Sequence, residues 1–129
     1  MMLVDSDVLI AHLRGVEAAR DWLVATRRSS GRITASVVTY AEITGGMRSA
    51  ERGAVASLFS ALDLVGVDRA VAHRSGELQR TYRRSHTGIG LADYLIAATA
   101  QVMGADLATL NVRHFPMFTG LEAPFSLPI

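Results

Sequence analysis

The chain of 129 residues has no cysteine, no lysine, only three prolines and no long apolar run. Without cysteine it can form neither a disulfide framework nor a thiolate-bound zinc site. Its four histidines lie apart and lack the spacing of a paired-histidine metal site. No stretch approaches the roughly 18 apolar residues of a transmembrane helix, and the N-terminus lacks the basic lead of a signal peptide. We therefore expect a cytoplasmic protein without a membrane segment.

The charged residues are nearly balanced, with thirteen arginines against twelve acids and a formal net charge of +1. The whole molecule is thus not a polycation, and a mechanism that requires a lysine is excluded. Arginine carries a planar set of donors that suits phosphate and carboxylate groups, and it does not lose its charge. The length fits a single domain, which we place at residues 1–129.

Apolar runs alternate with segments of helical periodicity, which is typical of a parallel sheet covered by helices on both faces. Strands are predicted at 2–5, 33–38, 64–67 and 107–110. Helices are predicted at 6–13, 16–27, 39–45, 51–62, 68–84 and 91–103, with Gly104 as the cap of the last one. The segment after Asn111 is expected to fold back as an ordered tail or edge strand. The predicted fold is α/β, a three-layer α/β/α sandwich around a mostly parallel sheet.

Three acidic residues stand near predicted strand-to-helix joints: Asp5, Glu42 and Asp93. In an open parallel sheet these joints lie along one edge, where ligands bind. Carboxylates from distant parts of the chain would meet there and raise one another's pKa unless a cation is present. A hard divalent ion such as Mg²⁺ prefers such oxygen ligands. The pattern predicts a divalent-metal site at this edge of the sheet.

Helix stability offers another explanation for each carboxylate. Thr39-x-x-Glu42 matches a capping box, in which the glutamate accepts a hydrogen bond from the threonine N–H. Asp93 in a first helical turn would interact with the helix dipole by about 0.3–1 kcal/mol. Apolar residues surround Asp93 on its helix, however, and burying an unpaired carboxylate costs far more than that. Asp5 has the weakest explanation of this kind, because a core strand rarely ends in an unpartnered acid.

The Asp5-Ser6-Asp7 run allows a second interpretation. It resembles the first motif of haloacid-dehalogenase-like phosphatases, which would make Asp5 a nucleophile. That chemistry also uses a basic side chain, usually lysine, and a late acidic pair, and the chain has neither. Asp7 is expected to lie on the first turn of the first helix, where it caps the helix or faces solvent. A metal-free nuclease using His86 and His114 and a non-catalytic RNA-binding module are further alternatives, although nothing in the sequence pairs these two histidines.

Four stretches, taken in order, resemble the PIN-domain nucleases, and most closely the VapC-type toxins of toxin–antitoxin operons. They are residues 3–10 (LVDSDVLI), 36–43 (SVVTYAEI), 89–98 (IGLADYLIAA) and 107–115 (LATLNVRHF). The order, the spacing and the chain length all match, so the resemblance covers essentially the whole sequence.

This resemblance implies a Mg²⁺-dependent endoribonuclease, with Mn²⁺ as a substitute and tRNA or rRNA as substrate. It also implies a homodimer that is inhibited by a small VapB-like antitoxin. By position, Asp5 and Asp93 would bind the metal, and Glu42 would bind it directly, through water, or position the attacking water. Asn111 would complete the catalytic set by orienting a water. Many relatives have aspartate at Asn111 and another acid at His114, which leaves the number of metal ions open.

RNA approaching an acidic crevice requires positive charge on the rim. Arg80, Arg83 and Arg84 precede the Asp93 helix, and Arg113 follows Asn111. We predict that these four arginines contact RNA, with Arg48 and Arg52 in a similar position beyond Glu42. The alternative is a solvated helix face, since residues 74, 77 and 80 have the spacing of surface ion pairs.

Overall fold

The structure is a computed structural model and describes residues 1–128. Four short strands form one sheet in the order β3-β2-β1-β4, and every pairing is parallel. The strands are β1 (Met2–Val4), β2 (Thr34–Ser36), β3 (Asp63–Val65) and β4 (Asp106–Ala108). The helices are α1 (Ser6–Leu13), α2 (Glu17–Ser30), α3 (Val37–Gly46), α4 (Arg52–Ser60), α5 (Arg69–Tyr82) and α6 (Leu91–Met103). Two short 3-10 helices complete the chain, η1 (Ser49–Glu51) and η2 (Val112–His114).

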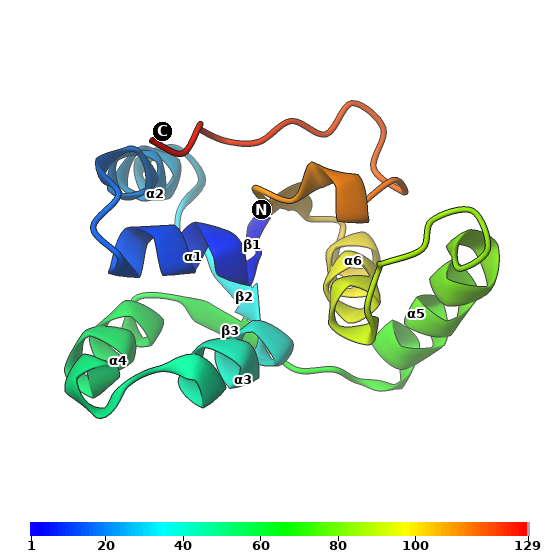
Figure 1. Ribbon diagram of the computed structural model, residues 1–129, viewed down its shortest axis with the longest axis horizontal. Coiled ribbons are helices and arrows are strands. Elements are labelled where there is room, and N and C mark those ends of the chain that lie inside the picture. Colours follow the sequence, from blue (N-terminus) through cyan, green and yellow to red (C-terminus); the bar gives the residue numbers. More distant parts are fainter. Residues whose placement is uncertain (129) are drawn as a thin grey trace.

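Helices cover both faces of the sheet, because successive side chains of a strand point to opposite sides. Leu3 belongs to a core with α5 and α6, whereas the next residue, Val4, belongs to a second core with α1, α3 and α4. Figure 1 shows α1 to α4 on one side of β1 and the α5–α6 pair on the other. The predicted three-layer α/β/α fold with a parallel sheet is therefore confirmed.

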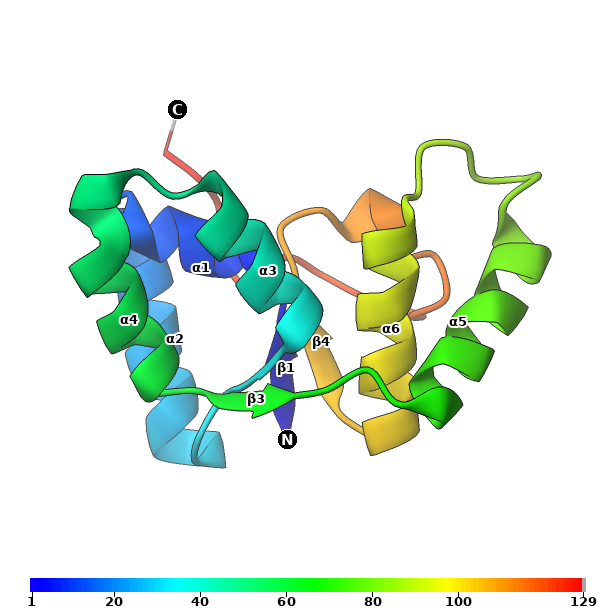
Figure 2. The same cartoon turned by 90° about the horizontal axis from the view of Figure 1, so that it is seen from below.

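The carboxyl ends of the strands lie at one end of the molecule. Figure 2 shows β1 and β4 running in the same direction, with α3, η2 and the beginning of α6 gathered at the end toward which these strands point. Asp5 follows β1 directly, and its N–H donates to the carbonyl of Ala108, the last residue of β4, at 2.9 Å. Parallel pairing thus brings residues about a hundred positions apart together at one edge.

The second strand is shorter than predicted and the helix after it begins earlier. β2 ends at Ser36, whose hydroxyl caps α3 by accepting the N–H of Val38 at 3.0 Å. Glu42 therefore lies in the second turn of α3 rather than at its start, and the predicted Thr39–Glu42 capping box is wrong. The Thr39 side chain is instead buried, and its hydroxyl has no hydrogen-bond partner among residues 1–128.

Other elements match the predictions to within a few residues. α1 has the predicted bounds, Asp68 caps α5 by accepting the N–H of Val71, and Gly104 ends α6 in the left-handed conformation. The segment after η2 forms a tail that crosses to the α1–α2 side (Figure 1) and contains no strand up to residue 128. None of the helices that the structure describes is long and apolar enough to cross a membrane.

Candidate active site

Asp5 is the most buried carboxylate at the carboxyl edge of the sheet. It is the N-cap of α1, and its Oδ1 accepts the N–H of Ser6 at 2.8 Å. Only 5% of the residue is exposed. The strand, the helix cap and the Ala108 contact together fix the direction of this side chain. The position of the Asp5 carboxylate is thus set by β1, which it follows, and by β4, to which its N–H donates.

Thr109 connects Asp5 to the loop that follows β4. Its fully buried hydroxyl donates to Asp5 Oδ2 at 2.8 Å and accepts the N–H of Asn111 at 3.0 Å. The Asn111 backbone is therefore tied to Asp5 through one hydroxyl group. The Asn111 residue itself is exposed beside the site. This arrangement places the Asn111 backbone close to Asp5 and leaves the Asn111 side chain exposed to solvent.

Asp7 is a fourth carboxylate of this site. It lies in the first turn of α1, as predicted, but the prediction that it caps the helix or faces solvent is wrong. Its Oδ2 accepts the N–H of Leu110 at 3.0 Å and lies 3.3 Å from the Thr109 hydroxyl. Its Oδ1 is buried without a hydrogen-bond partner in the described chain. The Asp-x-Asp run was the available signal. Sequence alone did not reveal that the loop after β4 would close over α1 and reach the second aspartate.

Asp93 lies in the first turn of α6, as predicted, but it is not an unpaired buried acid. Its side chain is 22% exposed, and its Oδ2 accepts the N–H of Gly90 at 3.2 Å. The same oxygen lies 3.0 Å from His114 Nδ1. We predicted no partner for either His86 or His114. In the structure His114 contacts Asp93, whereas His86 contacts the adjacent Ser85 hydroxyl. The η2 helix thus brings His114 into the site.

Glu42 extends toward the same group from the second turn of α3. It is exposed, and its pKa is raised by partial burial and by the nearby charges of Asp93 and Asp7, while a hydrogen bond from the Ser6 side chain lowers it. The three carboxylates predicted from the sequence are therefore brought together with Asp7. They reach the site from α1, α3 and α6, three helices that share the carboxyl edge of the sheet.

Burial makes the two most enclosed aspartates, Asp5 and Asp7, hard to ionise. Burial, and next the charge of Asp7, raises the pKa of Asp5 from 3.8 to about 6. Burial also raises the pKa of Asp7, against the lowering effect of the Leu110 N–H. A divalent cation would offset the repulsion between these carboxylates, and carboxylates are its preferred ligands. The chemistry of the donor set fits such an ion.

The carboxylates, however, do not surround a common point at which an ion could bind. Within residues 1–128, no three acidic or histidine side chains lie close enough together to hold a metal ion as they stand. Asp5 is held in place by its hydrogen bonds, whereas Glu42 is an exposed side chain on a helix. Binding an ion would therefore require the more exposed acids to turn toward Asp5.

The predicted RNA-contacting arginines occupy two places. Arg113 is exposed on η2, next to the His114 that contacts Asp93. Arg80 and Arg83 line a separate hollow of about 390 Å³ on α5, and Arg84 is exposed in the segment that leads toward α6. The predicted surface ion pair is present in part, because Arg74 lies 3.6 Å from Glu77. Of these four arginines, Arg113 alone is placed directly beside the carboxylates.

Comparison with known proteins assigns the chain to a family. The PIN domain model matches residues 2–116. The chain is 58% identical to ribonuclease VapC10 of Mycobacterium tuberculosis over 99% of this chain and 96% of that protein. It is 44% identical to ribonuclease VapC19 of the same species, over 97% and 100% of the two chains. A toxin–antitoxin complex from Klebsiella pneumoniae has the same fold, with a TM-score of 0.81 and 23% identity over 98% of this chain and 100% of that chain. The chain belongs to the PIN-domain family, and within it to the VapC group.

Proposed function

We propose that this protein is a divalent-metal-dependent endoribonuclease and the toxin of a toxin–antitoxin pair. The observation that carries the proposal is the group of four carboxylates at the carboxyl edge of the sheet, in which the pKa values of Asp5, Asp7 and Glu42 are raised. The names of the two mycobacterial relatives support ribonuclease activity. We infer that the ion is Mg²⁺, with Mn²⁺ able to replace it, and that the substrate is tRNA or rRNA.

In this mechanism Asp5 and Asp93 would hold the ion, and Glu42 would bind it directly, through water, or position the attacking water. The ion would polarise the scissile phosphate and lower the pKa of the attacking water. Asn111 orients that water through its amide oxygen. Thr109 and Asp7 act as positioning residues, since they hold the Asp5 carboxylate and the loop backbone that carries Asn111.

A phosphatase that uses Asp5 as nucleophile fits the geometry poorly. Both carboxylate oxygens of Asp5 already accept hydrogen bonds, from Ser6 and Thr109, and the residue is almost fully buried. A nucleophilic oxygen would have to leave one of these bonds to reach a substrate. The site therefore favours Asp5 as a ligand and positioning group over Asp5 as an attacking group.

The direct test is cleavage of a tRNA and rRNA mixture by purified protein with Mg²⁺ or Mn²⁺, with EDTA, and with the Asp93→Asn variant. We expect discrete fragments that disappear with EDTA and with the variant, provided its unfolding temperature shows that it is folded. Asp106→Asn, which changes an exposed aspartate at the opposite end of β4, is the matched control and should retain cleavage. Cleavage that persists in EDTA would contradict the proposal.

The partner of such a toxin would be a small VapB-like antitoxin, and the toxin itself a homodimer. The similar fold from Klebsiella pneumoniae comes from a toxin–antitoxin complex. Light scattering of the purified chain should give about twice the 13.8 kDa mass of one copy. Coexpression with a candidate VapB-like antitoxin should restore growth to cells that produce the toxin. Growth arrest unaffected by that antitoxin would argue against this pairing.

A further inference from the structure

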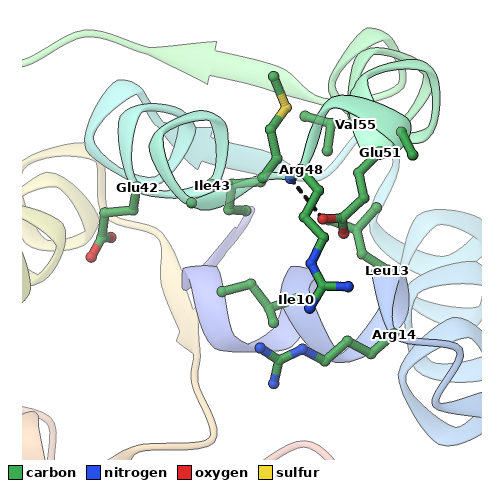
Figure 3. Close-up of a pocket in the computed structure, with 11 residues that line it drawn as sticks. Ile10, Leu13, Arg14, Glu42, Ile43, Arg48, Glu51 and Val55 are labelled. Carbon is green, nitrogen blue, oxygen red and sulfur yellow. Dashed lines mark hydrogen bonds between the residues drawn. The ribbon is translucent and has the colours of Figure 1, made fainter.

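A hollow of about 640 Å³ lies beside the carboxylates, between α1 and the segment that runs from α3 through η1 into α4. Its floor is apolar, with Leu13 from α1, Ile43 from α3 and Val55 from α4. Glu42 lines one end of it, so the hollow and the candidate active site share a residue. Figure 3 shows the Glu42 carboxylate at that end, pointing away from the rest of the hollow.

Two guanidinium groups project into this hollow from opposite walls. Arg14 follows the last residue of α1, and Arg48 lies between α3 and η1. In Figure 3 the Arg48 side chain extends from its wall toward α1, and the Arg14 side chain runs along α1. Neither arginine forms an ion pair within the part of the chain that the structure describes. Glu42 and Glu51 also line the hollow, but neither forms an ion pair with these two arginines. Two positive groups that face the same space favour an anion there.

The backbone around Arg48 is held in place by Glu51. The Arg48 N–H donates to Glu51 Oε1 at 2.8 Å and anchors the start of η1 (Figure 3). This bond occupies one Glu51 carboxylate oxygen with the backbone. The attraction of Arg14 to the carbonyl end of α1 explains a positive charge at that position. The helix dipole does not explain why Arg48, which comes from another element, also lines this hollow.

The position of the two arginines matches the path of a strand bound at the carboxylates. From Glu42 to the end of α3 at Gly46 the helix rises about 6 Å. A strand whose scissile phosphate lies at the carboxylates and that continues along α3 therefore reaches the hollow within a short distance. Single-stranded RNA is bound by positive groups along its backbone and by apolar or aromatic surfaces against its bases. The hollow offers both kinds of surface.

We propose that Arg14 and Arg48 together bind a backbone phosphate of single-stranded RNA beside the scissile position, with the base of that nucleotide against the apolar floor. This subsite rests on the proposed endoribonuclease function and deepens it. It adds a phosphate contact on the α1–α3 side of the carboxylates, whereas Arg113 lies on the η2 side.

The test is RNA binding by the Asp93→Asn protein, which does not cleave. The probe is a short single-stranded oligouridylate with a fluorescent label, measured by anisotropy between about 50 and 200 mM salt. Removing the contact with this one phosphate by Arg14→Gln and Arg48→Gln should reduce the slope of log affinity against log salt by about 0.7. The matched control, Arg20→Gln, removes an exposed arginine of α2 outside the hollow and should leave the slope unchanged.

Kinetics with the intact carboxylates give an independent measure. The double variant should raise KM about tenfold or more with kcat nearly unchanged, because the lost contacts are made equally to bound substrate and transition state. Arg48→Lys, which keeps the charge, should retain most of the affinity. An unchanged salt slope and KM in the folded double variant would overturn the subsite and leave the hollow to another occupant, such as an acidic protein segment. If the parent protein neither binds nor cleaves RNA, the proposed function itself fails.

Discussion

Asp5 shows how one residue links the chemistry of the site to the stability of the fold. Burial and the neighbouring Asp7 raise its pKa from 3.8 to about 6. The folded protein therefore holds a proton that the unfolded chain has already released between these two values. The contribution of Asp5 to stability is fully present below pH 3.8 and is lost as the pH rises through about 6. At neutral pH the ionised Asp5 is a source of strain in the metal-free fold.

The predicted result is that the metal-free protein loses stability as the pH rises. The rise of the pKa to about 6 corresponds to a total of about 3 kcal/mol, of which about 1 kcal/mol falls between about pH 5 and 7. Urea unfolding in EDTA at these two pH values measures it. Asp5→Asn should remove most of this difference, although Asp7 and Glu42, whose pKa values are also raised, contribute in the same direction. The account would be contradicted if the unfolding free energy of the wild type rose from pH 5 to pH 7 relative to that of Asp5→Asn.

Thr109 is the residue whose loss should separate positioning from catalysis. Thr109→Val removes the donor to Asp5 and the acceptor for the Asn111 N–H, and we expect about 1–3 kcal/mol of destabilisation. Loss of such a positioning contact should also lower cleavage by about 10–100-fold. Thr99→Val is the matched control, because that buried hydroxyl donates only to the Leu95 carbonyl of its own helix. Equal activity of the two folded variants would exclude a role for Thr109 in orienting the site.

At the scale of single elements, the end of α6 depends on one backbone conformation. Gly104 ends the helix with φ +67°, where an added Cβ would meet no atom within 4 Å. Gly104→Ala should thus cost about 1 kcal/mol through the left-handed backbone alone. Gly76, inside α5, has an equally open surrounding and no positive φ, so Gly76→Ala should stabilise the fold by about 0.5–1 kcal/mol. Chemical denaturation of both variants measures this contrast, and shifts of the same sign would contradict it.

Elements with local signals were predicted well from the sequence, and elements that depend on distant contacts were predicted less well. The bounds of α1, the Asp68 cap and the glycine at the end of α6 follow from residue types that act on their immediate neighbours. The start of α3 was missed because, apart from Ser36, the residues from Ile33 to Val38 are all apolar or β-branched. Its last two residues fit a buried strand and a helix equally well. Ser36 decides the boundary by capping the helix.

The same distinction applies to the candidate site. The edge on which Asp5, Glu42 and Asp93 meet follows from the alternation of strands and helices, which the sequence contains. The contacts of Asp7 with Leu110 and of His114 with Asp93 do not, because each depends on the path of the loop after β4. That path is fixed by the Thr109 hydroxyl, which reaches a residue 104 positions earlier in the chain. Side-chain bonds of this range leave no periodic pattern in a sequence.

At the scale of the whole molecule, the charge is nearly neutral but unevenly placed. The formal net charge is +1, yet four carboxylates converge at one end of the sheet. A ligand that binds only the folded state raises its stability by an amount that grows with concentration, about 2.7 kcal/mol at a hundred times Kd. An ion bound at this edge would also offset the repulsion among the acids. Stability of the entire fold therefore reports on binding at the site, independently of any RNA.

We accordingly expect Mg²⁺ or Mn²⁺ to raise the unfolding temperature of the wild-type protein at neutral pH, by about 10 °C near saturation for a domain of this size. EDTA should reverse the shift. Asp5→Asn and Asp93→Asn should abolish it, and Asp5→Asn should begin from a higher unfolding temperature in EDTA because the buried charge is gone. Asp106→Asn should respond as the wild type does. The shift should also shrink toward pH 5, where protons compete with the ion for Asp5. An unfolding temperature that ignores both ions at every concentration would show that these acids do not hold a metal in the free protein.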